Sequence, residues 1–139
     1  MYESRDDLDW EILRSLRADS RSTNVEIARR LGVSEGMVRQ RVKRMLQDGI
    51  VKKFTIETAS KGLKAMIDVS VAINVHTSKV SRKIMSIDGV EKVYEVSGGT
   101  DVVVIIDVCN SYQLNDIIEK IRATENVTST ATKLVLNEL

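Results

Sequence analysis

The chain has 139 residues, of which 42% are hydrophobic and 29% charged, and its 21 basic and 20 acidic residues leave a formal net charge of +1. This length suits one domain or two small ones, and the balanced charge by itself predicts no polyanionic partner. The single cysteine excludes an internal disulfide, no Cys/His cluster has metal-ligand spacing, and no apolar run is long enough to span a membrane. We therefore expect a cytoplasmic protein that holds no metal or other cofactor.

The first periodic segment, about residues 7–18, is predicted to form a helix. Leu8, Ile12 and Leu16 recur at the spacing of one helix face. Asp6 and Asp7 stand at its start, where acidic side chains interact favourably with the helix dipole. This segment supplies the first helix of a small helical domain.

Residues 24–50 have the spacing of a helix-turn-helix. Gly32 supplies the φ-tolerant residue of a tight turn, Ser34 is suited to cap the second helix, and Gly49 is suited to end it. The apolar faces of the two helices are formed by residues three and four apart, namely Val25, Ile27, Ala28 and Leu31 in the first and Val38, Val42 and Met45 in the second. Together with the first helix they predict a tri-helical or winged unit.

The exposed side of the second of these helices is basic and carries an amide, as expected of a recognition helix in the major groove of DNA. The candidate DNA contacts lie at its cap and along this side: Ser34, Glu35, Gly36, Met37, Arg39, Gln40, Lys43 and Arg44. A merely solvated charged helix is the ordinary alternative. Because turn, cap and basic face coincide here, we favour DNA binding.

The distribution of charge supports a double-stranded DNA partner where the net charge does not. Residues 29–53 hold eight basic and two acidic residues, a net charge of +6, whereas residues 54–139 hold nine basic and eleven acidic residues, a net charge of −2. One basic module beside a mildly acidic one is typical of a protein in which a single module contacts phosphates. Since one small module binds weakly, we expect a dimer that reads a palindromic operator.

The segment that follows predicts a strand and then a linker. Residues 50–56 are apolar except for Lys52 and Lys53, and residues 58–64 contain Ser60 and Gly62. We therefore expect a helix-turn-helix domain at 1–53, a strand and linker at 54–65, and a second domain at 66–139.

In the second domain the apolar residues alternate, which predicts strands, and two segments return to helical spacing. The expected order is a strand over 67–75, a helix capped by Thr77 or Ser78 and ending near Gly89, strands over 90–96 and 102–108 joined by a turn at Gly98-Gly99, a helix capped by Ser111, and a strand over 127–136. We expect the strand over 102–108 to be buried on both faces. The order βαββαβ predicts an α+β, ferredoxin-like domain, and its uncovered apolar sheet face predicts dimerisation sheet to sheet.

A helix-turn-helix followed by βαββαβ resembles the leucine-responsive regulator/AsnC family, the feast/famine regulators of prokaryotes. The stretch LDWEILRSLRADSRSTNVEIARRLGVS matches the opening pattern of that family. Val93-Tyr94, Val96-Ser97-Gly98 and Asp101 resemble its effector-binding turn, and Thr130 with Thr132 resembles the TxT of its last strand. The chain departs from the family at Gly99, where an acidic residue is common, and at Thr100, where an aromatic residue is often found.

The resemblance implies a transcription regulator with an amino-acid effector bound between dimers, in an assembly that commonly has eight subunits. The effector contacts that it implies are Tyr94, Gly98, Gly99, Thr100, Asp101, Thr130 and Thr132. Backbone N–H groups at Gly98-Gly99 can approach a carboxylate, and Asp101 can pair with an ammonium group. The same turn sequence is also an ordinary β-turn. Because Gly99 brings no carboxylate, we favour a neutral amino acid over lysine or arginine.

Two other functions compete with an effector-responsive regulator. An enzyme needs catalytic groups, but His76 and Cys109 are the only residues of their types and no catalytic triad or Walker-type glycine loop is evident. We therefore expect no enzyme and no catalytic residues. A ligand-independent architectural DNA-binding protein stays open as the alternative.

Overall fold

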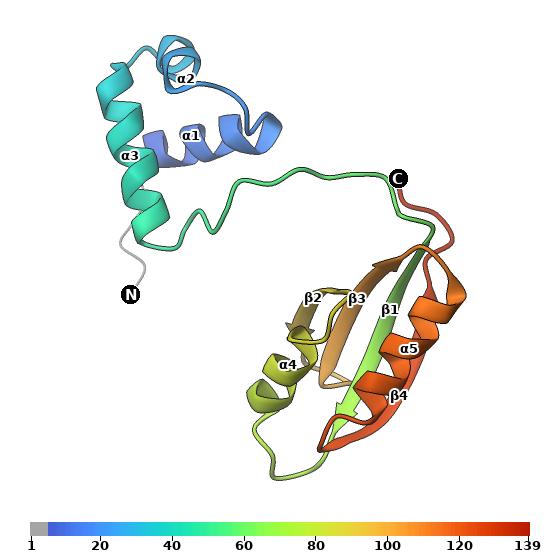
Figure 1. Cartoon of the computed structure of the whole chain (residues 1–139). Coiled ribbons are helices and arrows are strands. Elements are labelled where there is room, and N and C mark those ends of the chain that lie inside the picture. Colours follow the sequence, from blue (N-terminus) through green and yellow to red (C-terminus); the bar gives the residue numbers. More distant parts are fainter. Residues whose placement is uncertain (1–5) are drawn as a thin grey trace. The chain divides into compact units, whose positions relative to one another are not determined.

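The computed structural model describes residues 6–139, which form two compact units divided between Glu57 and Thr58 (Figure 1). The first unit is helical, and the second contains a four-stranded sheet with two helices. Each unit has a hydrophobic core of its own. The predicted α+β class, with a helix-turn-helix followed by a ferredoxin-like domain, is confirmed.

The first unit contains the three predicted helices, α1 (Asp7–Ala18), α2 (Asn24–Leu31) and α3 (Glu35–Gln47). Each begins at a side chain that caps it, because Asp6, Thr23 and Ser34 accept hydrogen bonds from backbone N–H groups of the first turn. The core of the unit is formed by the buried side chains of Ile12, Ile27, Ala28, Val38 and Met45. The predicted cap Ser34 is confirmed.

Two glycines end helices of this unit in the left-handed conformation that favours glycine. Gly32 has φ 68° and follows α2 directly, and Gly49 has φ 70° two residues after α3. These are the turn and helix-end positions that the spacing predicted. They fix the short connection from α2 to α3 and the exit of the chain from α3.

The strand predicted over residues 50–56 is wrong. Ile50 and Val51 pack against the helical core, but residues 52–62 belong to neither a helix nor a strand and are exposed. A strand needs a neighbour for its N–H and C=O groups. Within the described residues no other segment pairs with this one, so its apolar residues alone do not make a strand.

The second unit is built from four antiparallel strands in the order β2-β3-β1-β4, the order of a ferredoxin-like sheet. Its elements in chain order are β1 (Leu63–Val71), α4 (Thr77–Met85), β2 (Val90–Glu95), β3 (Val102–Val108), α5 (Ser111–Arg122) and β4 (Val127–Leu134). Both helices cover the same face of the sheet (Figure 1). Alternate residues of the two central strands, such as Ile67 and Val104, are fully buried beneath them.

Several boundaries differ from the prediction for local reasons. β1 begins at Leu63 and ends at Val71, because its extent follows its pairing with β3 and β4 rather than the run of apolar residues. Helix α4 has His76 at its cap position without a side-chain hydrogen bond, and α5 is capped by Asn110, whose side chain accepts from the Gln113 N–H at 3.0 Å. Thr77 and Ser111 are therefore the first helical residues rather than caps.

The face of the sheet opposite the helices is open in the single chain. Met66 of β1 lies opposite Ile105 of β3, and Tyr94 of β2 lies opposite Val103. Val103 and Ile105 are half-buried, so the expectation that β3 is buried on both faces is wrong for one chain. An ion pair of 2.6 Å between Lys133 and Asp68 connects β4 to β1.

A buried carboxylate joins α1 to α3. Asp9 is 1% exposed and accepts hydrogen bonds from the guanidinium groups of Arg41, at 3.1 Å, and of Arg44. Arg41 also pairs with Asp6, the cap of α1. Hydrogen bonds from Arg41 and from the Asp9 backbone N–H hold the pKa of the Asp6 carboxyl below its ordinary range. This acid–arginine cluster (Asp6, Asp9, Arg41, Arg44) fixes α3 against α1.

We expect the substitution Asp9→Asn to lower the free energy of unfolding of the first unit by about 1–3 kcal/mol, because a neutral amide is a weaker acceptor for two guanidinium groups. Urea denaturation followed by the fluorescence of Trp10, the only tryptophan and a residue of α1, measures this. The control is Asp7→Asn, an exposed acid of the same helix turn, which should change stability by less than about 0.5 kcal/mol. Equal effects of the two substitutions would contradict the role of Asp9.

Candidate DNA-binding and effector sites

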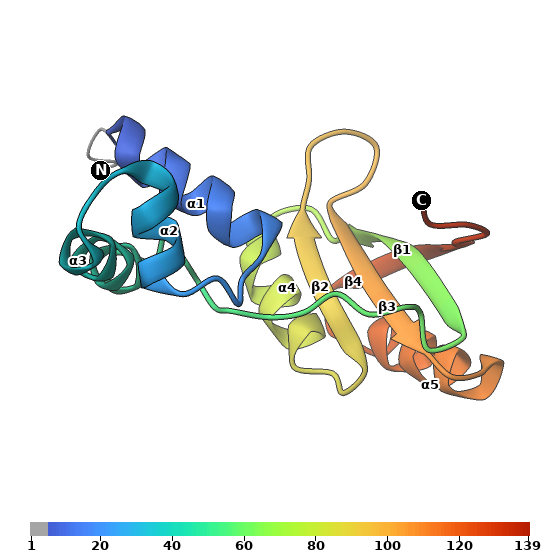
Figure 2. The same cartoon turned by 90° about the horizontal axis from the view of Figure 1, so that it is seen from above.

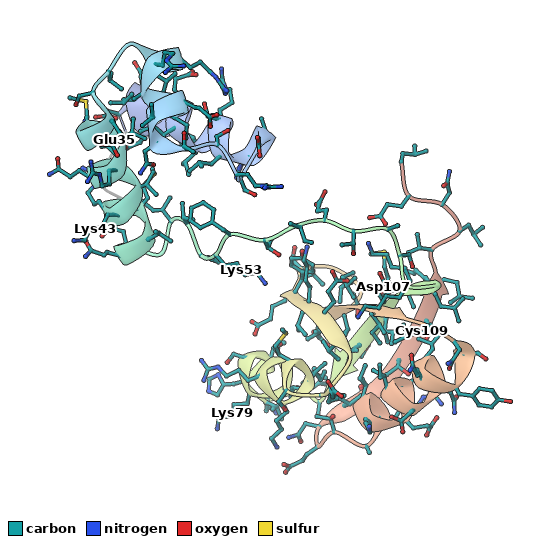
Figure 3. The ribbon with its side chains drawn as sticks, turned by 45° about the horizontal axis from the view of Figure 1, so that its top comes forward. Glu35, Lys43, Lys53, Lys79, Asp107 and Cys109 are labelled. Atoms are coloured by element: carbon teal, nitrogen blue, oxygen red, sulfur yellow. The ribbon has the colours of Figure 1, made fainter. Side chains whose placement is uncertain are left out.

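Helix α3 has one buried side and one exposed side. Val38 and Met45 are fully buried against the core, and the Ser34 hydroxyl accepts a hydrogen bond from the Met37 N–H at 3.2 Å. Six of the predicted DNA contacts are exposed along the rest of the helix: Gly36, Met37, Arg39, Gln40, Lys43 and Arg44. Figure 3 shows Glu35 and Lys43 on this helix. The structure thus places the predicted contacts on α3 and its cap, in a compact three-helix unit with its own core.

The exposed residues of α3 differ in whether their polar groups are already engaged. Arg39 is paired with Glu35, and Arg44 is paired with the buried Asp9. Among the described residues, no partner forms a hydrogen bond or ion pair with the side chain of Gln40 or Lys43. Gln40 and Lys43 are therefore available to a ligand without breaking an internal interaction.

Internal ion pairs also lower the positive charge that residues 29–53 offer to DNA. Of its eight basic residues, Arg39, Arg41 and Arg44 are bound to carboxylates. The five whose side chains form no hydrogen bond or ion pair within the described residues are Arg29, Arg30, Lys43, Lys52 and Lys53. These five carry the charge that can neutralise phosphates without loss of an internal ion pair.

Neither packing nor backbone conformation requires a glycine at position 36, in the first turn of α3. A Cβ added there would meet no atom within 4 Å, and its backbone conformation is one that other residues adopt. Glycine in a helix costs roughly 0.5–1 kcal/mol relative to alanine. The absence of a side chain at this exposed position instead leaves room for close approach of a ligand to the helix backbone.

The loop between β2 and β3 carries most of the predicted effector contacts and extends beyond the end of the sheet (Figure 2). It is fastened to the end of β1 by three hydrogen bonds. The Thr100 hydroxyl and the Asp101 N–H donate to the Val69 carbonyl oxygen at 2.9 and 3.1 Å, and the Asp101 carboxylate accepts from the Val71 N–H at 2.8 Å. Asp101 is thus a structural residue of the loop, with one carboxylate oxygen already engaged.

The other predicted effector contacts lie on two different faces of the sheet. Thr130 and Thr132 lie opposite Val69 and Ile67, on the helix side of β4, and the Thr130 hydroxyl accepts from the Arg122 Nε at 3.2 Å. Tyr94 is half-exposed and lies on the open face. The structure therefore brings the loop and Thr130 to the same end of β1, and places Tyr94 on the opposite face of the sheet from Thr130 and Thr132.

Neither the single histidine nor the single cysteine forms part of a catalytic or metal cluster in the part of the chain that the structure describes. His76 precedes α4 and Cys109 follows β3, and both are exposed (Figure 3 labels Cys109). No group of three or more His, Cys, Asp or Glu side chains in residues 6–139 is placed to hold a metal ion. No helix in the same range is long and apolar enough to cross a membrane.

Comparison with protein families matches both units. Residues 5–52 match the family described as winged helix-turn-helix DNA-binding, and residues 64–139 match the Lrp/AsnC ligand binding domain. The second match covers more than half of the chain.

Similar proteins include regulators matched over nearly their whole length. The HTH-type transcriptional regulator LysM of Saccharolobus solfataricus is 35% identical over 94% of this chain and 93% of its own. The regulator LrpA of Mycobacterium tuberculosis is 30% identical over 99% and 93%. A homocitrate synthase of Saccharolobus islandicus is 44% identical over 77 residues, which are 55% of this chain but only 17% of that enzyme. A match to so small a part of the enzyme carries no enzymatic function.

Solved structures agree with the whole fold. The crystal structure of Mycobacterium tuberculosis LrpA has a TM-score of 0.85 at 29% identity, over 96% of this chain and 94% of that one. A feast or famine regulatory protein of the same organism, complexed with L-methionine, also has a TM-score of 0.85 at 29% identity, over 97% and 94%. From the matched families, the relatives and the two-unit fold we conclude that this chain is a DNA-binding transcription regulator of the Lrp/AsnC family.

Proposed function

We propose that this regulator reads a palindromic operator through the N-terminal half of α3 and that an amino acid modulates its DNA binding or its assembly. This proposal rests on the exposed side of α3, which presents Gly36, Gln40 and Lys43. That side lies opposite the buried Val38 and Met45. Gln40 has the amide that pairs with adenine, and Lys43 has a cation free for phosphate or guanine. The protein acts in the cytoplasm and is not an enzyme.

We propose a dimer formed through the open face of the sheet. Met66, Val103, Ile105 and Tyr94 give this face an apolar centre, and the Lys133–Asp68 ion pair lies on the same face. A sheet with one uncovered apolar face gains stability when a second layer covers it. Two-fold symmetry then presents two α3 helices to successive major grooves, roughly 34 Å apart. Four such dimers give the octamer that is common in the family.

We propose that the effector binds beside the loop between β2 and β3 and is a neutral amino acid. Gly98 and Gly99 lie in this loop with open space where a Cβ would be, so a carboxylate can approach their backbone. The second Asp101 carboxylate oxygen forms no hydrogen bond within the described residues, so it can pair with an ammonium group. The complex of the mycobacterial relative with L-methionine supports a neutral ligand.

One observation favours the alternative, an architectural DNA-binding protein without an effector. Asp101 is the one acid of the loop, and it already accepts a hydrogen bond from the Val71 N–H. This hydrogen bond stabilises the loop whether or not a ligand binds, so the presence of the carboxylate does not require an effector. The two functions differ in whether any amino acid changes DNA affinity.

The close approach of DNA to α3 is tested with Gly36→Ala. We expect this variant to be more stable by roughly 0.5–1 kcal/mol, because alanine favours the helix and meets no internal atom. We expect its affinity for an operator selected from random DNA to fall by about tenfold, the effect of losing one base contact. Fluorescence anisotropy measures the affinity. The control Gly99→Ala, equally open but in the other unit, should bind as the unmodified protein does when no amino acid is present.

Assembly is tested with Ile105→Lys, which puts a charge in the centre of the open face and spares the core. Light scattering after size exclusion should report a dimer or larger assembly for the unmodified chain at micromolar concentration, and a smaller species for the variant. The control Ile73→Lys changes an 89% exposed residue outside the sheet and should leave the mass unchanged. A stable monomer for the unmodified chain would refute the proposed dimer.

Effector binding is tested by a thermal-shift screen of the twenty amino acids. A ligand that binds the native state at 100 times its Kd adds about 2.7 kcal/mol to the free energy of unfolding. If the ligand changes the affinity for DNA, DNA must change the affinity for the ligand by the same factor. Asp101→Asn should abolish the shift, since the amide still accepts from the Val71 N–H but carries no charge. The exposed Asp88→Asn is the control. If no amino acid alters stability or DNA affinity, the architectural function holds.

A further inference from the structure

Arg39 of α3 is paired with an acid of its own helix, whereas Arg41 and Arg44 are paired with Asp9 of α1. The Arg39 Nε donates to the Glu35 Oε1 at 3.0 Å, and its Nη2 donates to Oε2 of the same carboxylate. The two residues are four apart, one helix turn, so both lie along the same side of α3. The side chain of Arg39 is 65% exposed and that of Glu35 is 34% exposed. The pair is therefore held together at the surface that α3 offers to a ligand.

The geometry of this pair leaves a definite set of donors free. A guanidinium group has five N–H donors, and the carboxylate occupies one on Nε and one on Nη2. The remaining donors are the two on Nη1 and the second on Nη2, which form the fork at the end of the group. A fork of this kind matches the O6 and N7 acceptors of guanine in the major groove.

The charge of the pair favours a base over a phosphate as its partner. Glu35 neutralises Arg39, and a carboxylate beside a phosphate repels it. Lys43, one turn further along α3, has no such acid and is the better phosphate contact. An arginine fixed before binding also loses less conformational freedom when it meets a base.

We infer that Glu35 is a positioning residue that orients Arg39 to read guanine in each operator half-site. This inference rests on the proposed reading of DNA by α3. Glu35 contacts no base itself and acts through the guanidinium group that it holds. An ion pair that only stabilised the helix would have no effect on which base is selected.

The inference is tested by selecting operators from random DNA with the full-length chain and four variants. The variants are Glu35→Gln, Arg39→Ala, both together, and the control Glu11→Gln, which removes the acid of an Arg14 pair on α1. Guanine should be selected at one position of each half-site by the unmodified chain and by Glu11→Gln. Arg39→Ala should abolish that preference, and Glu35→Gln should lower it about fivefold, the lower end of what one bidentate contact supplies.

The double variant distinguishes positioning from other roles. If Glu35 acts through Arg39, adding Glu35→Gln to Arg39→Ala changes the base preference no further. A cytosine preference that Glu35→Gln removes even without Arg39 would overturn the inference, because Glu35 would then contact a base. Unchanged guanine preference in Glu35→Gln, with helix content verified by circular dichroism, would overturn it as well.

Failure of the inference is distinguishable from failure of the proposed function. If Arg39→Ala weakens binding to selected and random DNA equally, Arg39 contacts phosphate and only the inference is overturned. If the unmodified chain binds random DNA but selects no sequence at all, the proposed operator reading is itself contradicted.

Discussion

The buried carboxylate of Asp9 is the constraint on which the DNA-binding unit depends. A carboxylate that is 1% exposed must be matched by charged donors, and it finds two guanidinium groups on α3. Because the donors come from positions 41 and 44, α3 can rotate or slide only by breaking them. The exposed side of α3, opposite the buried Val38 and Met45, is then fixed as well, and it carries Gly36, Gln40 and Lys43.

Ion pairs within the first unit also reduce the number of positive charges that are available to DNA. Counted along the sequence, residues 29–53 offer a net charge of +6. In the fold, three of those cations are bound to carboxylates: Arg39 to Glu35 of the same helix, and Arg41 and Arg44 to Asp9 of α1. The cations without partners in the described residues are divided between α2, α3 and the segment after α3. For the proposed DNA complex, we therefore expect most phosphate contacts to come from the segments on either side of α3, with Lys43 as the one cation of α3 free to join them.

Features with a local cause could be predicted from the sequence. Helix spacing, the Ser34 cap and the left-handed glycines at 32 and 49 depend on residues a few positions apart. The missing strand over 50–56 and the early start of β1 could not be predicted, since both depend on which segment lies alongside. One sequence feature indicates that Asp9 is buried: its spacing places it on the apolar helix face of Ile12 and Leu16. The hydrogen bond of Asp101 to Val71 left none, because it joins residues thirty apart.

Communication between the two units is constrained by the segment that joins them. Residues 52–62 are exposed and lie in neither a helix nor a strand, so this segment has no helix or strand to carry a displacement from the loop between β2 and β3 to α3. The loop is instead fastened to the end of β1, a central strand of the sheet. A ligand held there acts on the sheet and on whatever packs against it. In the assembly proposed above, which is built through the sheet, we therefore expect an effector to change DNA binding through the spacing between the α3 helices of different chains.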